Sequence, residues 1–323
     1  MANPKTTNDH LNESCLYFLS ISIPYIYSIS IGIAFAILSL LTIASNTILV
    51  YTLYKTKQLN TISNKLILAM NISDLCLGLF AFPFLAVVIL RGNAFGICDL
   101  EIGSSYIMTF FGTFSFTIMN CISIDRYFRV TKLNRYNLYM KGFHMKIMII
   151  SSFSIACGTT LLINLHPSFL QQVFFSSAST FFVIVLILLY RPMLKRLQDH
   201  VSSLNSQKMN SSMPPGNNEP GISFQERRNQ LSATKTVKFL LVTIIALYTP
   251  YHVMLTWWSY YRFLKKTEPG HGLSVVYSWS CLLVLSNAYV NSWIIIHGNT
   301  RSRRFVLTLL QQCRLANRVA DEI

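Results

Sequence analysis

Seven blocks of apolar residues, each long enough to cross a lipid bilayer, constrain this chain more than any other feature. A helix rises 1.5 Å per residue, so about 20 apolar residues span the hydrocarbon core. Of the 323 residues, 12% are charged and 52% are hydrophobic, whereas about 25% charged is usual for a soluble domain. This composition excludes a soluble enzyme, a disordered chain and a secreted disulfide scaffold. The blocks lie near 25–54, 62–90, 99–128, 144–165, 169–191, 235–261 and 273–297.

The basic residues fall mainly on one side of these spans. With the N-terminus placed outside, 22 of the 27 lysines and arginines lie in the inner segments and 5 in the outer ones. This split follows the positive-inside rule. Anionic lipids of the inner leaflet then account for the net charge of +15, and no nucleic-acid partner is needed. We therefore expect a multi-pass protein of the plasma membrane, with an extracellular N-terminus and a cytoplasmic C-terminus.

The predicted fold class is an all-α membrane protein, a seven-transmembrane helix bundle with a short amphipathic helix after helix 7. An extracellular tail would occupy residues 1–24 and the transmembrane domain residues 25–297, with a polar cytoplasmic loop at about 192–230. In residues 298–323, apolar residues at helical spacing follow a basic cluster. This pattern predicts a helix on the inner membrane surface, with Cys313 placed for palmitoylation. The alternative is a fraying tail with a free thiol.

Two features of the outer side fit this orientation. Asn12 begins the tripeptide Asn-Glu-Ser, a glycosylation sequon. Cys15 and Cys98 are the two cysteines near the outer face, where oxidising conditions permit a disulfide. The sequence is compatible with a disulfide between Cys15 and Cys98 and with two free thiols.

Asp74 is the only acidic residue deep in a span, and a carboxylate at that depth costs about 2.5–3.5 kcal/mol to insert. Ser115, Asn287 and Asn291 are expected at similar depth. Carboxylate, hydroxyl and amide oxygens suit a hard cation, so we expect an allosteric sodium ion and no other cofactor. The alternative is a polar network between helices without an ion, to which Asn46 would contribute.

Pro250 lies in the middle of the sixth span, where it removes one i→i−4 hydrogen bond. We expect a hinge there, and a static kink is the alternative. Below it, Lys235 and Lys238 give the helix a basic inner end.

Asp125-Arg126-Tyr127 ends the third span. Together with Asn46, Asp74 and the other polar residues above, and with Pro250, it resembles in order and depth the pattern of the rhodopsin-like (class A) G-protein-coupled receptors. The resemblance implies a receptor, and not an enzyme, that binds an extracellular ligand. It also implies activation of a heterotrimeric G protein by outward movement of helix 6, and arrestin as a partner. The matches are Asn46, Asn71-Ile-Ser-Asp74-Leu, Ser115, Asp125-Arg126-Tyr127, Pro250, and Asn287 with Asn291.

The resemblance also implies roles for single residues. Arg126 would pair with Asp125 at rest and meet the G protein on activation. The full G-protein-coupling set would be Asp125, Arg126, Tyr127, Tyr190, Lys235 and Lys238. The activation switch would be Tyr248, in the place of the usual tryptophan, with Pro250 and Asn291. The sodium site would be Asp74, Ser115, Asn287 and Asn291.

Several positions depart from the family pattern. Ser292 and Ile295 stand where the family typically has the proline and tyrosine of Asn-Pro-x-x-Tyr. Ser292 can bend a helix mildly by bonding back to its own helix, but Ile295 supplies no phenol. Gln230 replaces the frequent glutamate of helix 6, and Glu101 occupies the helix-3 cysteine position. The alternative function is therefore a receptor-like protein that signals poorly through G proteins, either arrestin-biased or a heterodimer partner.

The ligand class can be narrowed. Met108 stands in place of the aspartate of amine receptors, which disfavours a biogenic amine, and helix 7 lacks the lysine of a retinal Schiff base. Tyr127-Phe128 and the short second outer loop look weakly similar to the melanocortin, lysolipid, cannabinoid and adenosine branch. Trp257 and Trp258 are expected in an interfacial aromatic belt. The ligand pocket is expected among Met108, Tyr251, His252, Leu255, Tyr277 and Cys281.

Two other function classes fit less well. A transporter or channel would carry paired charges along a path through the membrane, and Asp74 is the only deep one. A membrane enzyme would show a motif such as His-Glu-x-x-His or Gly-x-Ser-x-Gly, and the sequence has neither.

Overall fold

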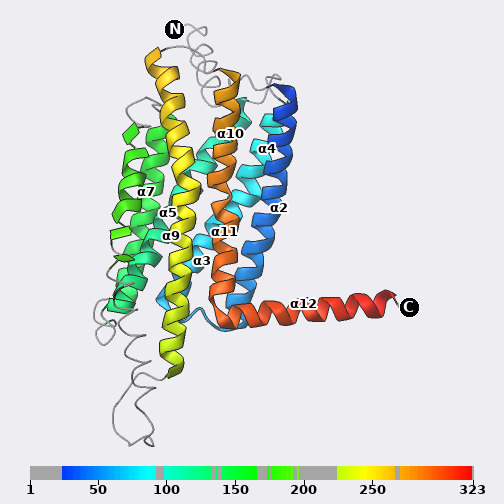
Figure 1. The fold of residues 1–323 in the computed structure, drawn as a ribbon, viewed down its shortest axis with the longest axis vertical. Helices are drawn as coiled ribbons and strands as arrows, with labels where there is room; N and C mark the ends of the chain where they lie inside the picture. The colour runs from blue at the N-terminus through cyan, green and yellow to red at the C-terminus, as the bar shows by residue number, and fades with distance from the viewer. Residues whose placement is uncertain are drawn as a thin grey trace, which may run out of the picture.

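The apolar blocks form helices because a backbone in hydrocarbon must satisfy its hydrogen bonds within its own segment. The computed structural model shows these helices side by side in one bundle, with α12 lying across the lower end (Figure 1). The structure describes residues 24–91, 98–131, 136, 140–165, 173–174, 176–185, 187–188, 190–191, 195, 224–265 and 270–321.

The second span is divided by a π-helical segment, η1, and the seventh is divided in two at Ser286. A second π-helical segment, η3, ends the sixth. The elements are α2 (Tyr25–Lys55), α3 (Ile62–Cys76), η1 (Leu77–Ala81), α4 (Phe82–Arg91), α5 (Cys98–Thr131), α7 (Gly142–Leu165), α9 (Phe224–Ser259), η3 (Tyr260–Lys265), α10 (His271–Leu285), α11 (Asn287–Gly298) and α12 (Thr300–Asp321).

These elements make a seven-helix bundle, as the sequence predicts. Within the described residues, five segments are long and apolar enough to cross a membrane. A shorter apolar helix, Ser176–Val185, lies at the predicted fifth span, and α9 together with η3 covers the predicted sixth. The five segments are Tyr25–Lys55, Ile62–Arg91, Ile102–Arg129, Gly142–Asn164 and His271–Gly298.

Two boundaries differ from those expected. Helix α9 begins at Phe224, so the last residues of the stretch predicted to be loop are helical. Helix α12 has 22 residues and is therefore not the short helix predicted. Both extensions are polar, and hydropathy alone does not detect a helix that has left the hydrocarbon.

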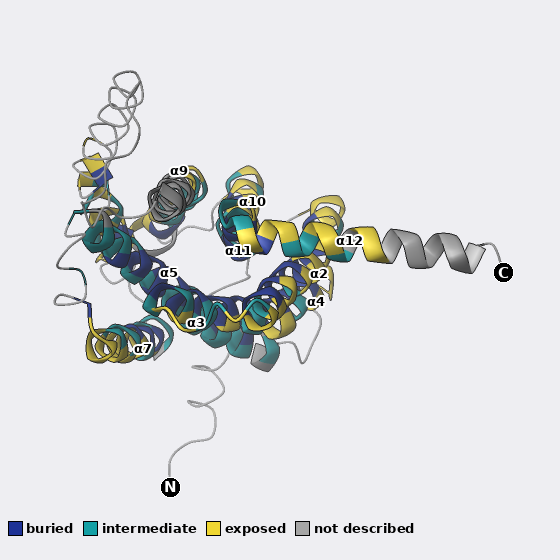
Figure 2. Cartoon of the chain, turned by 90° about the horizontal axis from the view of Figure 1, so that it is seen from below, coloured by how far each residue is buried: buried dark blue, intermediate teal, exposed yellow. Residues whose placement is uncertain are grey.

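Large apolar side chains cover the outside of the bundle, and many polar side chains lie inside. Figure 2 shows the buried residues on the inner faces of α5, α3 and α2, and exposed residues on the outer faces. Ile37 and Leu40 of α2 are exposed, whereas Thr42 and Asn46 are buried. Lipid tails are as apolar as leucine, so helices associate through close packing and hydrogen bonds between small or polar residues.

The π-helical segment η1 begins three residues after Asp74. It lies in the middle of the second span, where that span packs against α2. Pro83, just beyond it, has no amide hydrogen for the helix ladder. The Ser39 hydroxyl donates to the Gly78 carbonyl at 2.7 Å. A Cβ on Gly78 would lie 3.1 Å from Ile43 Cγ1, so glycine permits the close approach of the two helices. π-Bulges are frequent at functional sites.

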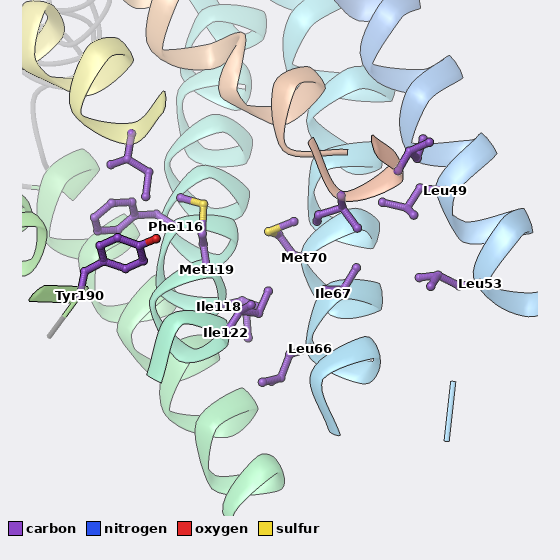
Figure 3. Packing of buried hydrophobic residues seen from close by; sticks show 13 residues of the cluster. Leu49, Leu53, Leu66, Ile67, Met70, Phe116, Ile118, Met119, Ile122 and Tyr190 are labelled. Atoms are coloured by element: carbon purple, nitrogen blue, oxygen red, sulfur yellow. The ribbon is translucent and has the colours of Figure 1, made fainter. Parts of the chain in front are cut away.

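A buried apolar cluster holds the inner half of the bundle together. Figure 3 shows Met70 of α3 and Met119 of α5 within this cluster, and Tyr190 beside Phe116. Ile295 of α11 belongs to the same cluster and is 4% exposed. The cluster separates the polar site at mid-membrane from the inner face.

Candidate functional site

A cavity of about 180 Å³ opens between α5, α9 and α10 in the outer half of the bundle. The residues that the sequence predicts for a ligand pocket lie on the wall of this cavity. Side chains three or four residues apart lie on one face of a helix and can therefore line the same cavity. All six of them line the cavity: Met108, Tyr251, His252, Leu255, Tyr277 and Cys281.

An aromatic stack forms one side of the cavity. Tyr277 of α10 packs against Trp258 with ring centroids 5.4 Å apart, and against Tyr251 at 6.3 Å. Trp258 is 3% exposed and lines the cavity, so its assignment to an interfacial belt was wrong. Trp257, next along the chain, is 55% exposed on the outer face, where a belt residue would lie.

The floor of the cavity is Asp74, which is 1% exposed. Ser115 and Asn291 lie next to its carboxylate, and Asn287 lines the same part of the cavity. Within the described residues, no hydrogen bond of 3.5 Å or shorter reaches either carboxylate oxygen, the Ser115 hydroxyl oxygen or the amide oxygens of Asn287 and Asn291, all of which are buried. One carboxylate and three neutral oxygens at such a site fit a monovalent hard cation, since buried polar groups otherwise need hydrogen bonds.

The neighbouring amides belong to a separate network. Asn46 Nδ2 donates to the carbonyls of Thr42 and Ala288, at 2.8 and 3.1 Å. The Ser292 hydroxyl lies 2.6 Å from both Asn46 Oδ1 and Asn71 Oδ1. It therefore connects α11 with α2 and α3. Asn46 therefore belongs to this network, because its oxygen accepts a hydrogen bond from Ser292.

Ser292 does not act as the sequence predicts. Its hydroxyl bonds across the bundle instead of back to its own helix. The break in helix 7 falls at Ser286, where the hydroxyl donates to the Leu283 carbonyl at 2.6 Å. A hydroxyl on a helix can bond locally or to a neighbour, and the sequence does not show which neighbour is within reach.

Tyr248 lies between the cavity and the inner core. Its ring is 5.1 Å from that of Phe116 in the core cluster and 6.0 Å from that of His252 in the cavity wall. It also lies beside Asn287 at the cavity floor. Two residues further on, Pro250 is inside α9, which continues as a helix through it. One side chain therefore contacts both the cavity wall and the inner core.

At the inner end of α5, Asp125 is fully buried and accepts a hydrogen bond of 2.6 Å from the Tyr136 hydroxyl. Arg129 donates to the same hydroxyl at 3.0 Å, and its guanidinium lies 4.6 Å from the Tyr136 ring centroid. The ion pair of Asp125 in the described residues is with Arg129, at 4.0 Å. The pairing of Asp125 with Arg126 that the resemblance implies is not the one observed.

Sequence reasoning missed both Arg129 and Tyr136. Arg129 is four residues after Asp125, a spacing that places both on one helix face, so its signal was present. Tyr136 carries no such signal, because it lies beyond the end of α5, where helical spacing does not predict contacts. Burial and the adjacent Asp125 carboxylate raise the pKa of the Tyr136 phenol, so it stays a hydrogen-bond donor at neutral pH.

Tyr127 and Tyr190 both pack in or against the inner core cluster, and Tyr190 is 9% exposed. The remaining predicted residues lie outside the part of the chain that the structure describes. Asn12 and Cys15 precede it, and it does not include the side chains of Cys98, Lys235, Lys238 and Cys313.

The fold and the site together define a class: a seven-helix membrane protein with an outer cavity and a polar centre beneath it. The family model "7 transmembrane receptor (rhodopsin family)" matches residues 45–294. The chain belongs to this family, which comprises receptors and not enzymes. It is a multi-pass membrane protein.

Individual relatives agree with this assignment. The chain is 28% identical to the 5-hydroxytryptamine receptor 1B of Vulpes vulpes over 163 residues, which is 50% of this chain and 40% of that receptor. It is 33% identical to the muscarinic acetylcholine receptor M5 of Macaca mulatta over 109 residues, 32% of this chain and 20% of that receptor.

A solved structure agrees in fold. Squid rhodopsin superposes with a TM-score of 0.70 over 90% of this chain and 87% of its own, at 16% sequence identity. At this identity the likeness extends to the fold alone. The matches to the two relatives above span less than half of each relative's length.

Proposed function

We propose that this protein is a G-protein-coupled receptor of the plasma membrane, with its N-terminus outside, that binds an extracellular ligand in the central cavity. The observation that carries the proposal is the continuity from the cavity wall through Tyr248 to the inner core cluster. A ligand that repacks Tyr248 would bias helix 6 to move outward at Pro250, exposing an inner surface to a heterotrimeric G protein. Arrestin would bind the same activated state.

The ligand of this receptor is not a biogenic amine. Two relatives are named for 5-hydroxytryptamine and acetylcholine, so amines need to be considered. Here Met108 lines the cavity wall, and the carboxylate that lines the cavity, Asp74, is at its floor. An ammonium group in the upper cavity would face no carboxylate from the described residues. No opposite charge would then offset the free-energy cost of removing the ammonium group from water.

Modifications complete the proposal. Asn12 carries a glycan outside, Cys15 and Cys98 form a disulfide near the outer face, and Cys313 holds α12 to the inner leaflet through a palmitoyl chain. A sodium ion at Asp74 stabilises the resting state.

The test is nucleotide exchange without ligand on a panel of Gα proteins, with purified protein in lipid discs. Arg126→Ala is expected to abolish exchange, because Arg126 would supply the contact to the G protein, and the variant should fold and reach the membrane normally. Exchange that survives in the variant would contradict the role of Arg126.

Exchange absent from both the parent and the variant, with ligand-dependent arrestin recruitment intact, would favour the second candidate, an arrestin-biased or heterodimeric receptor. Ile295, packed in the apolar core without a phenol, supports that candidate.

Tyr136→Phe is expected to raise ligand-independent exchange roughly tenfold, which corresponds to about 1.4 kcal/mol. The phenol donates to the buried Asp125 carboxylate, and hydrogen bonds to charged groups contribute about 1.5–3 kcal/mol. Exchange rates of both proteins, measured at several temperatures, test this expectation. Tyr51→Phe is the matched control, since Tyr51 is 44% exposed and contacts Phe305 on the outer face. Equal rates in Tyr136→Phe and the parent would show that this bond does not hold the resting state.

A further inference from the structure

A second hollow lies on the outside of the bundle, between helix Ser176–Val185 and α9. Its volume is about 610 Å³. Val253 and Trp257 on its wall are each 55% exposed, and Tyr260 at its outer end is 41% exposed. These residues lie on the outer, apolar face of the sixth span, so this groove faces the bilayer.

His252 belongs to both hollows, because its side chain lines the groove and the central cavity. Its Nδ1 lies 3.2 Å from the Ser176 hydroxyl and its Nε2 lies 2.8 Å from the Ser179 hydroxyl. These contacts close the gap between helix Ser176–Val185 and α9 with one imidazole and two small side chains. Opening this gap requires the exchange of these two hydrogen bonds.

The charge of the lining limits what can pass. Of the described residues that line the two hollows, Asp74 and His252 are the ones that can carry charge, and Asp74 lies at the floor. A charged molecule crossing the groove would lose its hydration without gaining an opposite charge, at a cost of several kcal/mol. An uncharged molecule with a hydroxyl or carbonyl group would replace the two serine contacts of His252.

We propose that the groove is a lateral entrance from the bilayer to the central cavity, closed by His252, and that the ligand is an uncharged amphiphile that dissolves in the membrane. Its polar group bonds to His252, and its apolar body lies along Val253 and Trp257. This inference rests on the proposed receptor function and names its ligand class. Tyr260 is eight residues beyond His252, roughly 12 Å along the helix, so the groove extends from the interface into the membrane.

Fluorescence of Trp258 gives a direct test, because this side chain is buried in the cavity wall. The chain has four tryptophans, and the other three are each at least 41% exposed. Replacing Trp257, Trp279 and Trp293 by phenylalanine leaves Trp258 as the single reporter. The full chain is placed in phosphatidylcholine discs that contain a monoacylglycerol with a brominated acyl chain, a quencher that acts at contact.

We expect the brominated monoacylglycerol to quench Trp258 at least twofold more than a phosphatidylcholine with the same brominated chain, whose charged headgroup and second chain keep it out. Thr180→Phe, which fills the groove, should reduce quenching to the phosphatidylcholine level. Ser177→Phe is the matched control, because Ser177 is also exposed on helix Ser176–Val185 but does not line the groove. His252→Ala should increase quenching.

Equal quenching in Thr180→Phe and Ser177→Phe would overturn the lateral entrance. Quenching of Trp258 by aqueous acrylamide and not by the monoacylglycerol would also overturn it, in favour of entry from the outer solution. Neither readout depends on a G protein. A protein that exchanges nucleotide but shows no lipid quenching would therefore refute this inference alone, and the reverse result would refute the coupling alone.

Discussion

Replacing Ser292 by alanine is expected to lower the free energy of unfolding by about 2–4 kcal/mol. The Ser292 hydroxyl is fully buried and its single hydrogen is shared between Asn46 Oδ1 and Asn71 Oδ1, each 2.6 Å away. The alanine leaves both amide oxygens without a donor, and an unsatisfied buried acceptor costs about 1–3 kcal/mol. Thermal unfolding of the purified protein in lipid discs measures the loss.

Ser286→Ala is the matched control for this measurement. Ser286 lies on the same helix, and its hydroxyl donates to the Leu283 carbonyl of the preceding turn. Losing a local bond next to a helix break should change the unfolding midpoint much less than losing a bridge between three helices. Ser292→Thr, which keeps the hydroxyl, should recover part of the loss. If the two alanine variants unfold at the same temperature, the bridge contributes nothing to stability.

The sequence was sufficient for the fold because hydrocarbon leaves a backbone few choices. Apolar blocks about 20 residues long had to be helices, and the positions of the basic residues predict which ends face inward. The residues at which the helices end beyond the membrane were not predictable. Helix α9, for example, begins at Phe224 in a polar segment where hydropathy gives no signal. The π-helical segment η1 lies in an unbroken apolar run, and Pro83 was the one sign of irregularity.

For the site, spacing predicted which residues share a wall but not which of two neighbours faces inward. Tyr251, Leu255 and Trp258 follow a three- and four-residue spacing, and all three line the cavity. Trp257 and Trp258 are about 100° apart around the helix, so one had to face lipid, and hydropathy does not distinguish them. The bond from Tyr136 to Asp125 joins a residue beyond the end of α5 to that helix, and no helical period predicts such a contact.

Replacing Asp74 by asparagine is expected to abolish any stabilisation of this protein by sodium. A ligand that binds the folded state alone stabilises it by RT ln(1 + [L]/Kd), about 2.7 kcal/mol at a hundredfold excess over Kd. Within the described part of the chain, the buried oxygens of Asp74, Ser115, Asn287 and Asn291 accept no hydrogen bond of 3.5 Å or shorter, and a cation would satisfy them together. The parent protein should therefore unfold at a higher temperature in sodium chloride than in N-methylglucamine chloride of equal ionic strength.

The matched control is Asp125→Asn, which removes the other fully buried carboxylate but leaves the mid-membrane site unchanged. This variant should keep the difference between the two salts, whereas Asp74→Asn should unfold at one temperature in both. Without the ion, Asp74→Asn should be the more stable protein, because an isolated carboxylate in the interior costs more than an amide. A parent protein indifferent to sodium, together with a stabilised Asp74→Asn variant, would show that these oxygens form a polar network that binds no ion.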